Sequence, residues 1–509
     1  MNRNVLFPAA LLLAISFVCS GADSNPVSGR REETVILTPK PGPAPRINGP
    51  RVLGCRPGHP FLFRIPTTGE RPIRFVASGL PSGLHLDEAT GIITGSVPAC
   101  GQYKVNLKAK NSHGTCSRLL SIVAGDTLAL TPPMGWNHWY AHYDRITDQL
   151  MREAADLLVS SGMADVGYAY VDIDDCWMNA PNNGDSRRVG PLRDSNGSIV
   201  PNQYFPDMKA LTQYIHSKGL KAGIYTSPGP LTCGGFCGSY QHEAQDAKQF
   251  ADWGFDFLKY DWCSYDEVVK RDHTLPVLKR PYQLMGDLLK QQSRDIVFNL
   301  CQYGMGNVWE WGAEVGGHCW RTAGDLGMEL TNIFPVALKN AEHRAWSKPG
   351  CWNDPDYVQI GFIGDGAGKM KPCPLTANQQ YSFMSLWALM AAPLFYSGEM
   401  RTLDPFTLNV LCNPEVIDVD QDPLGICART ISVSGETFVM VKNLENGTKA
   451  VGLFNRGESA AIVTAKWSHL DIRGRRSVRD LWRQKELGKF SGEFSAEVGR
   501  HGCVLVVVR

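Results

Sequence analysis

The chain of 509 residues lacks the features of several common functional classes. Its net charge of +1 gives no reason to expect binding to nucleic acid or to an acidic membrane surface. Beyond the N-terminal segment, no apolar run is long enough for a transmembrane helix. No GxGxxG or Walker loop follows an apolar run, and no pair of CxxC motifs has zinc-finger spacing. The sequence therefore predicts no metal, nucleotide or other cofactor.

The N-terminal residues 1–22 have the pattern of a secretory signal peptide. A positively charged start precedes the apolar segment 5–18, which is too short to span a bilayer comfortably. We expect cleavage after Ser20 or Ala22, and hence a secreted or periplasmic protein. Cys19 is a candidate lipid-attachment site, but the residue before it suits lipidation poorly. The 15 cysteines of the chain suit an oxidising compartment.

The remaining chain divides into four parts by composition. Residues 23–45 are rich in Pro, Gly, Ser and charge, which is typical of a linker. Residues 46–125 contain short alternating runs between Gly and Pro turns, which predict a small Ig-like β-sandwich. In residues 126–424, amphipathic helices alternate with short apolar runs, which favours a (β/α)8 TIM barrel over an open sheet. Helix signals fade in residues 425–509, where we expect a C-terminal antiparallel β-sandwich.

The predicted barrel contains clear helix and strand signals. Amphipathic helices are expected at 148–160, 208–218 and 245–253. Short apolar runs that favour strands are found at 168–173, 221–225, 257–260, 296–300 and 393–396.

Asp261 is the residue whose position says most about function. It ends the apolar run that begins at Phe257, two residues after Lys259. Carboxylates at strand ends lie at the C-terminal face of a barrel, where barrel enzymes carry their active sites. A single such residue is explained as an ordinary helix cap. The same pattern recurs, however, at Asp174, Asp175, Asp325, Asp354 and Asp356.

Six ordered motifs carry a resemblance to a known family. They are TPPMGWNHW at 131–139, YVDIDDCW at 170–177, GLKAGIY at 219–225, LKYDWC at 258–263, WRTAGD at 320–325 and WNDPD at 352–356. Together they resemble glycoside hydrolase family 27, the α-galactosidase family, over about residues 128–505. A separate motif, LPSGLHLD at 80–87 followed by TGIITG, resembles the Ig-like modules of bacterial secreted enzymes.

The resemblance implies a secreted, retaining exo-α-galactosidase acting on an α-galactoside oligo- or polysaccharide. It assigns the nucleophile to Asp261 and the acid/base to Asp325, the two carboxyls that retaining hydrolysis requires. Lys259 projects from the same face of the strand as Asp261, where its charge favours the ionised carboxylate. We expect Arg321 to contact the sugar and Asp325 to be buried near Asp261, which would favour the protonated acid.

The resemblance also implies the substrate pocket. Asp174 and Asp175 would bind the 4-hydroxyl and the 6-hydroxyl of galactose, because paired carboxylates accept from two hydroxyl groups at once. The pocket would contain Trp139, Asp174, Asp175, Tyr225, Lys259, Gln302, Arg321 and Asp356. Cys233 and Cys263 match a disulfide of the family that tethers the nucleophile's loop.

The chain departs from the family pattern at two places. Many members have Cys-Glu-Trp after the fifth strand, where this chain has Cys301, Gln302 and Tyr303. Gln302 can still hydrogen-bond a 2-hydroxyl, and together with Met305 it leaves little room for an acetamido group. Tyr357 replaces the Met that usually follows Asp-Pro-Asp. These differences concern specificity and not reaction type.

Other readings remain open at this point. Within the family they are β-L-arabinopyranosidase, α-N-acetylgalactosaminidase and isomaltodextranase-like activity. Because a longer acid beside Asp174 would fill the space of C6, the second Asp at 175 favours galactose over arabinopyranose. A non-catalytic carbohydrate-binding protein is the alternative from another class, which the presence of Asp261 and Asp325 argues against. In the Ig-like module, Cys100 and Cys116 are candidates for a disulfide between the last strands.

Overall fold

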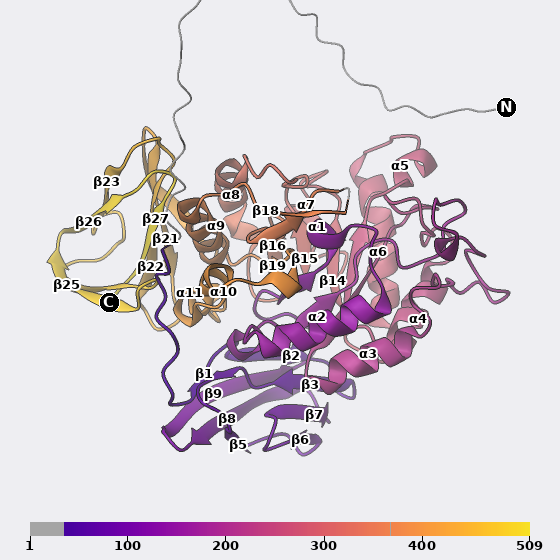
Figure 1. The fold of residues 1–509 in the computed structure, drawn as a ribbon, viewed down its shortest axis with the longest axis horizontal. Coiled ribbons are helices and arrows are strands. Elements are labelled where there is room, and N and C mark those ends of the chain that lie inside the picture. The colour runs from indigo at the N-terminus through magenta and orange to yellow at the C-terminus, as the bar shows by residue number, and fades with distance from the viewer. Residues whose placement is uncertain (1–34, 367) are drawn as a thin grey trace, which may run out of the picture. The chain divides into compact units, whose positions relative to one another are not determined.

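The computed structural model describes residues 35–366 and 368–509 (Figure 1). The predicted signal peptide, Cys19 and residues 23–34 of the predicted linker lie outside the described residues. The described end of that linker is held by two asparagines that follow the last barrel strand in sequence. Thr38 donates its backbone N–H to the side chain of Asn409, and the Thr38 hydroxyl accepts a hydrogen bond from Asn413. Within the described ranges, no helix has both the length and the apolar character that a membrane span needs.

Eight parallel strands form the predicted barrel, and the first seven of them pair consecutively along the chain. The last strand pairs with the first, with Leu394 opposite Met134, and a bridge between Val358 and Tyr396 closes the ring. The (β/α)8 prediction is therefore confirmed. The strands are β10 (Met134–Asn137), β11 (Tyr170–Asp172), β12 (Lys221–Thr226), β13 (Phe257–Asp261), β14 (Val297–Cys301), β15 (Cys319–Arg321), β16 (Trp352–Asp354) and β19 (Leu394–Tyr396).

Amphipathic helices surround this sheet, as the ribbon shows for α2, α3, α4 and α6 (Figure 1). Helix α2 illustrates the local cause: the Thr147 hydroxyl caps its first turn by accepting from the Leu150 N–H, and the apolar face that includes Met151 is buried. The principal helices are α2 (Asp148–Ser160), α3 (Met208–Ser217), α4 (Glu243–Trp253), α6 (Leu275–Lys290), α8 (Ile333–Glu342) and α9 (Ala377–Met390).

Shorter elements complete this part of the chain, and several lie in the loops that follow the barrel strands. They are α1 (Trp139–His142), α5 (Tyr265–Val268), α7 (Val308–Trp311), the hairpin of β17 (Phe362–Gly364) and β18 (Met370–Pro372), α10 (Pro405–Leu411) and α11 (Pro414–Asp420).

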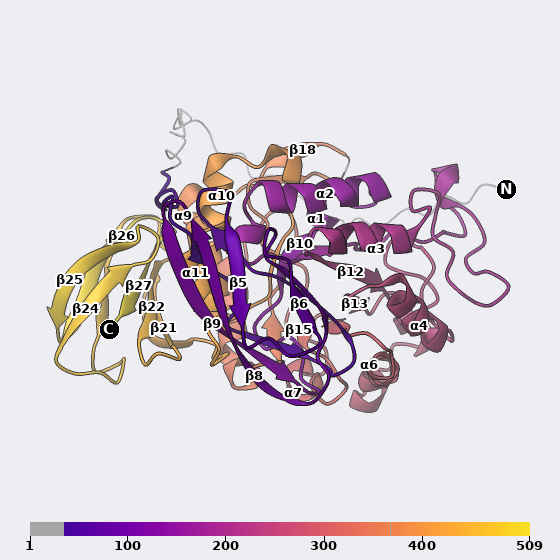
Figure 2. The ribbon, with the colours of Figure 1, turned by 90° about the horizontal axis from the view of Figure 1, so that it is seen from below.

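The N-terminal domain is the predicted Ig-like sandwich. A four-stranded sheet of order β2-β9-β8-β5 and a three-stranded sheet of order β3-β7-β6 share one apolar core, and Figure 2 shows the long strands of the first sheet side by side. The strands are β1 (Arg46–Ile47), β2 (Val52–Cys55), β3 (Pro60–Arg64), β4 (Thr67–Thr68), β5 (Arg74–Ser78), β6 (Leu84–Leu86), β7 (Ile92–Ser96), β8 (Gly101–Asn111) and β9 (Gly114–Ala124).

The disulfide considered between Cys100 and Cys116 is wrong. The tight turn between β8 and β9 sets a register in which Cys116 lies opposite Ala109, whereas Cys100 immediately precedes Gly101, which lies opposite Ala124. The two cysteines therefore lie near opposite ends of the hairpin, and both are free thiols. In a hairpin, residues lie opposite each other when they are equally far from the turn. Cys100 and Cys116 are at different distances from the turn, so they do not meet despite their short separation in sequence.

The C-terminal domain is an antiparallel β-sandwich. A six-stranded sheet of order β20-β21-β22-β27-β24-β25 packs on the pair β23–β26. Both faces of β21 are buried: Val439 faces the sandwich core, while Phe438 and Met440 pack with the barrel's core beside α9. The strands are β20 (Arg429–Ser434), β21 (Thr437–Asn443), β22 (Lys449–Asn455), β23 (Ala461–Lys466), β24 (Arg475–Asp480), β25 (Lys485–Ser491), β26 (Glu493–Val498) and β27 (Cys503–Val508).

The Ig-like domain contacts the barrel at the N-terminal ends of its strands. Asp295, just before β14, accepts the backbone N–H of Arg56 at 2.9 Å and lies 2.8 Å from Nδ1 of His59. Asp165, before β11, is held by Arg71 at 2.7 Å. Because barrel enzymes use the opposite face for chemistry, this domain lies away from the predicted site.

Candidate active site

A pocket opens at the C-terminal ends of the barrel strands. Its empty space is about 370 Å³, including the open mouth. It brings together all the predicted catalytic and substrate-binding residues except Gln302. The lining consists of Trp139, Tyr140, Asp174, Asp175, Tyr225, Cys233, Lys259, Asp261, Tyr303, Arg321, Asp325, Asp356 and Tyr357.

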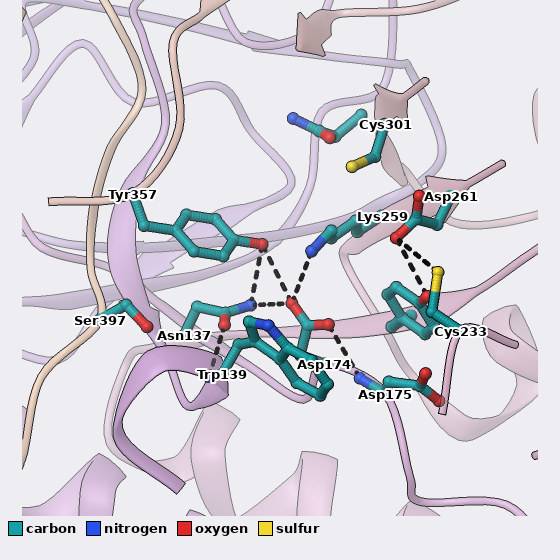
Figure 3. A network of polar contacts seen from close by, with 12 residues as sticks. Asn137, Trp139, Asp174, Asp175, Cys233, Lys259, Asp261, Cys301, Tyr357 and Ser397 are labelled. Atoms are coloured by element: carbon teal, nitrogen blue, oxygen red, sulfur yellow. Dashed lines mark hydrogen bonds and ion pairs between the residues drawn. The ribbon is translucent and has the colours of Figure 1, made fainter. Parts of the chain in front are cut away.

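Asp174 is the centre of a hydrogen-bond network in this pocket (Figure 3). Its Oδ2 accepts from Nζ of Lys259 at 2.9 Å, from Nδ2 of Asn137 at 2.9 Å and from the Tyr357 hydroxyl at 3.1 Å. Its Oδ1 accepts the backbone N–H of Asp175 and keeps a lone pair for a ligand. Burial raises the pKa of Asp174, but Lys259, His138 and the backbone hydrogen bond from Asp175 together bring the pKa below its ordinary value.

The neighbouring carboxyl, Asp175, lies in a different environment. Its oxygens accept the backbone N–H groups of Cys176 and Gly234, both at 2.7 Å. Burial without an adjacent cation raises its pKa to about 7, against the lowering effect of these donors. Both protonation states are therefore populated near neutral pH. Asp175 can accept a hydrogen bond from a hydroxyl group, or donate one to it, while Asp174 only accepts.

Asp261 ends β13 with a donor on each carboxylate oxygen. Oδ1 accepts from the Tyr303 hydroxyl at 2.6 Å and from its neighbour's N–H at 2.8 Å, and Oδ2 accepts from the Tyr225 hydroxyl at 3.0 Å. Burial raises the pKa of Asp261, while the Lys259 charge and the Tyr303 hydrogen bond act in the opposite direction. The carboxylate is thus fixed in orientation and aimed into the pocket.

Asp325 follows β15 and lies at the mouth of the pocket. Its side chain is 56% exposed, so the predicted burial of this residue is wrong. Arg321 is buried and donates to Oδ1 of Asp325 at 3.1 Å, while its other terminal nitrogen lies 3.3 Å from Asp356. The exposure follows from position, because Asp325 lies four residues beyond the end of the strand, in a loop that solvent reaches.

Asp356 supports this side of the pocket. Its Oδ2 accepts from the Tyr140 hydroxyl at 2.9 Å and from the backbone N–H of Leu326 at 2.8 Å, and its Oδ1 accepts from the N–H of Tyr357. Burial raises its pKa to about 6, although Arg321 pulls it down. Asp356 therefore fixes both Arg321 and the loop that carries Asp325.

Gln302 is the one predicted pocket residue that the structure does not place in the lining. Its side-chain oxygen accepts the backbone N–H of Gly304 at 2.9 Å, and its side-chain nitrogen donates to the carbonyl of Met305 at 3.3 Å. Both ends of the amide are used within its own loop. Tyr303 faces the pocket instead, with its backbone in the left-handed region at φ 63°.

Cys233 and Cys263 form the predicted disulfide, the only one among the described cysteines. It joins the loop after β12 to the residue two positions after Asp261, and Gly234 in the same loop donates to Asp175. The two sulfur atoms and a carboxylate oxygen of Asp261 lie within 4.8 Å of one another. Because both sulfurs are bonded to each other, this group offers a metal ion little beyond one carboxylate.

The sequence analysis assigned no role in the site to three lining residues, Tyr140, Tyr303 and Tyr357, or to Asn137, which supports Asp174 from behind. Asn137 and Tyr140 lie in and beside the first motif, and Tyr357 follows the last one directly. Position next to a motif was therefore an available signal for these three. Tyr303 was named only as part of a departure from the family pattern, and nothing in its spacing indicated that it would reach Asp261.

A larger cavity of about 1130 Å³, including open solvent, lies between the Ig-like domain and the N-terminal face of the barrel. Its lining includes apolar side chains such as Phe61 and two acids. Asp256 is held by His216 and Arg294, and Asp295 by the contacts described above. Because both acids are already paired, we assign this cavity to the junction between the two domains. The candidate catalytic residues lie at the opposite face of the barrel.

The family model for alpha-galactosidase A matches residues 131–422, more than half of the chain. The chain belongs to this family of glycoside hydrolases. The model for the alpha-galactosidase C-terminal β-sandwich domain matches residues 434–508, and an Ig-domain model matches residues 44–125. The resemblance drawn from the six motifs is therefore confirmed for the barrel and the C-terminal domain, and that drawn from the separate N-terminal motif is confirmed for the Ig-like domain.

Individual relatives support the same assignment. An alpha-galactosidase of Oryza sativa is 39% identical over 386 residues, which cover 75% of this chain and 85% of the relative. Alpha-galactosidase I of Mortierella vinacea has a solved structure with a TM-score of 0.66 and 31% identity, covering 76% of this chain and 98% of its own. A Bacteroides fragilis protein described as a candidate alpha-galactosidase/melibiase is similar over 93% of this chain and 99% of its own, with a TM-score of 0.84 and 37% identity.

Proposed function

We propose that this protein is a retaining exo-α-galactosidase that removes terminal, non-reducing α-D-galactose from oligo- or polysaccharides. The observation that carries the proposal is the convergence of Asp261, Asp325 and the Asp174–Lys259 pair in one pocket at the C-terminal ends of the barrel strands. Family membership and the alpha-galactosidase relatives add support.

In the first step, a carboxylate oxygen of Asp261 attacks C1 of the galactosyl group from the face opposite the leaving group. The C1–O bond breaks as Asp325 gives its proton to the departing oxygen, and a β-galactosyl ester forms. The exposed position of Asp325 suits this role, because the leaving group extends out of the pocket mouth. Arg321 holds the Asp325 side chain in reach at 3.1 Å.

In the second step, Asp325 takes a proton from a water molecule, which attacks C1 as the bond to Asp261 breaks. Two inversions at C1 give net retention and release α-galactose. The Lys259–Asp174 ion pair and Asp175 bind the hydroxyls of the sugar. Both acids are almost fully buried, so a sugar that leaves one of them without a hydroxyl partner would bind much less well.

The first test of this proposal is a panel of four p-nitrophenyl glycosides: α-D-galactoside, α-N-acetylgalactosaminide, β-L-arabinopyranoside and α-D-glucoside. We expect kcat/KM for the α-galactoside to exceed those for the β-L-arabinopyranoside and the α-D-glucoside by roughly 100-fold or more, because the buried acids reject a sugar with a missing or inverted hydroxyl. Faster release from the arabinopyranoside or the galactosaminide would assign the pocket to another activity of the family. No release from any of the four would favour a carbohydrate-binding protein.

We also propose that the protein is exported. The sequence pattern of residues 1–22 supports this, as does a disulfide in the loop beside Asp261, since such bonds persist in oxidising compartments.

A further inference from the structure

The loop after β14 turns Tyr303 toward the proposed nucleophile. Gln302 closes this turn by accepting the Gly304 N–H, and the Tyr303 backbone lies at φ 63°, a region that bulky residues rarely occupy. Strain of this kind persists where the surrounding structure determines it, and it concentrates at functional sites. The outcome of this turn is a short contact, 2.6 Å, between the Tyr303 hydroxyl and Oδ1 of Asp261.

The phenol of Tyr303 is a permanent donor in this contact. Burial and the negative charge of Asp261 both raise the pKa of Tyr303 well above its ordinary value, so its proton stays in place at any working pH. A hydrogen bond from a neutral donor to a carboxylate is short and about twice as strong as one between neutral groups. Tyr225 makes the corresponding, longer contact of 3.0 Å with Oδ2.

We propose that Tyr303 is a positioning residue for the nucleophile: it holds Asp261 ionised before attack and speeds its departure when the galactosyl ester is hydrolysed. The inference rests on the proposed function and deepens it. In the ester, the carboxyl group of Asp261 carries no full negative charge. That charge returns as the bond between C1 and the Asp261 oxygen breaks. A donor beside Oδ1 stabilises the returning charge more than it stabilises the ester, which lowers the barrier of the second step.

The test compares Tyr303→Phe with Tyr282→Phe. Tyr282 is a matched control, because its buried hydroxyl has no hydrogen-bond partner among the described residues while its ring lies 6.2 Å from that of Trp262, the neighbour of Asp261. In Tyr303→Phe, the acidic limb of the kcat/KM profile should move to higher pH by about one unit, because the lost hydrogen bond no longer favours the ionised carboxylate. The limb of Tyr282→Phe should stay at the wild-type position.

A second readout isolates the departure of Asp261. With 2,4-dinitrophenyl α-galactoside, whose leaving group needs little protonation, Tyr303→Phe should lose about tenfold in kcat and a similar factor in KM, because the ester accumulates. A pre-steady-state burst of dinitrophenol should accompany the change. If Tyr303→Phe melts much earlier than wild type, Tyr303→Leu, which also has no side-chain hydrogen-bond donor, carries the same two expectations.

The outcomes separate this inference from the proposed function. An unmoved acidic limb and an absent burst in the folded Tyr303 variants would overturn the role of Tyr303 and leave the activity assignment intact. A limb that moves equally in Tyr282→Phe would also overturn it, since the effect would then belong to the packing around Asp261. A wild-type protein without α-galactosidase activity would instead overturn the proposed function.

Discussion

Replacing Asp261 by Asn should abolish turnover of α-galactosides while the protein stays folded. The amide is nearly isosteric with the carboxylate but cannot form the galactosyl ester, and loss of a nucleophile typically costs about 10⁴-fold or more in kcat. The measurement is release of p-nitrophenol from the α-galactoside by the purified variant. Glu267→Gln, an exposed acid-to-amide change six residues along the same segment, is the matched control and should retain wild-type activity.

The stability of the same variant gives an independent check. Burial raises the pKa of Asp261, so folding favours its protonated form, and the ionised form destabilises the folded state as the pH rises through and above the ordinary carboxyl range. Asn removes this penalty. The melting temperature of Asp261→Asn at pH 7 should therefore equal or exceed that of wild type, and the difference should shrink toward pH 4. Near wild-type turnover in the folded variant would exclude Asp261 as the nucleophile.

Replacing Asp325 by Ala should produce a loss that depends on the leaving group. Hydrolysis of an alkyl α-galactoside should fall by roughly 10²- to 10⁴-fold, because its leaving oxygen needs a proton. With 2,4-dinitrophenyl α-galactoside the first step should survive and the ester should accumulate, since no base remains to activate water. Added azide needs no base, so it should restore turnover and yield α-galactosyl azide through a second inversion at C1.

The control for this variant is Glu329→Gln, which changes an exposed acid four residues further along the same loop and should behave as wild type. Equal losses on the alkyl and dinitrophenyl substrates, or a β-galactosyl azide product, would assign the acid/base role to another residue.

The barrel and most of the pocket could be predicted because each depends on local order along the chain. Parallel strands joined by helices place all their carboxyl ends at one face, so Asp174, Asp261 and Arg321 had to meet once the strands were identified. The alternation of side chains along β13 then puts Lys259 and Asp261 on the same side. The disulfide between Cys233 and Cys263 came from the family resemblance, since spacing alone does not define a pairing.

Residues beyond the strand ends were harder to place, because alternation no longer applies there. Gln302 was expected in the pocket, but its amide finds two partners inside its own turn, and the left-handed backbone of the next residue sends Tyr303 inward instead. Asp325 was expected to be buried, yet the three residues between it and the strand carry it to the rim. Both outcomes depend on backbone geometry in a loop, which no residue pattern encodes.

The supporting network around Asp174 also lay beyond the sequence. Tyr357 occupies a position where the family usually has Met, and its hydroxyl donates to Asp174 from the far end of the barrel sequence. The contact requires the ring of strands to close, because it joins residues that are 183 positions apart in sequence. The sequence showed that Tyr357 departs from the family pattern. That its hydroxyl contacts Asp174 could be seen only from the folded structure.

The most direct test of the account is a proton NMR time course of p-nitrophenyl α-galactoside hydrolysis by the wild-type protein. The signals of the two anomers of free galactose are resolved, and mutarotation is slow enough to see which forms first. The double displacement through Asp261 predicts α-galactose as the first product, with the β anomer growing in later. β-Galactose as the first product would mean a single inversion and would contradict the covalent role of Asp261.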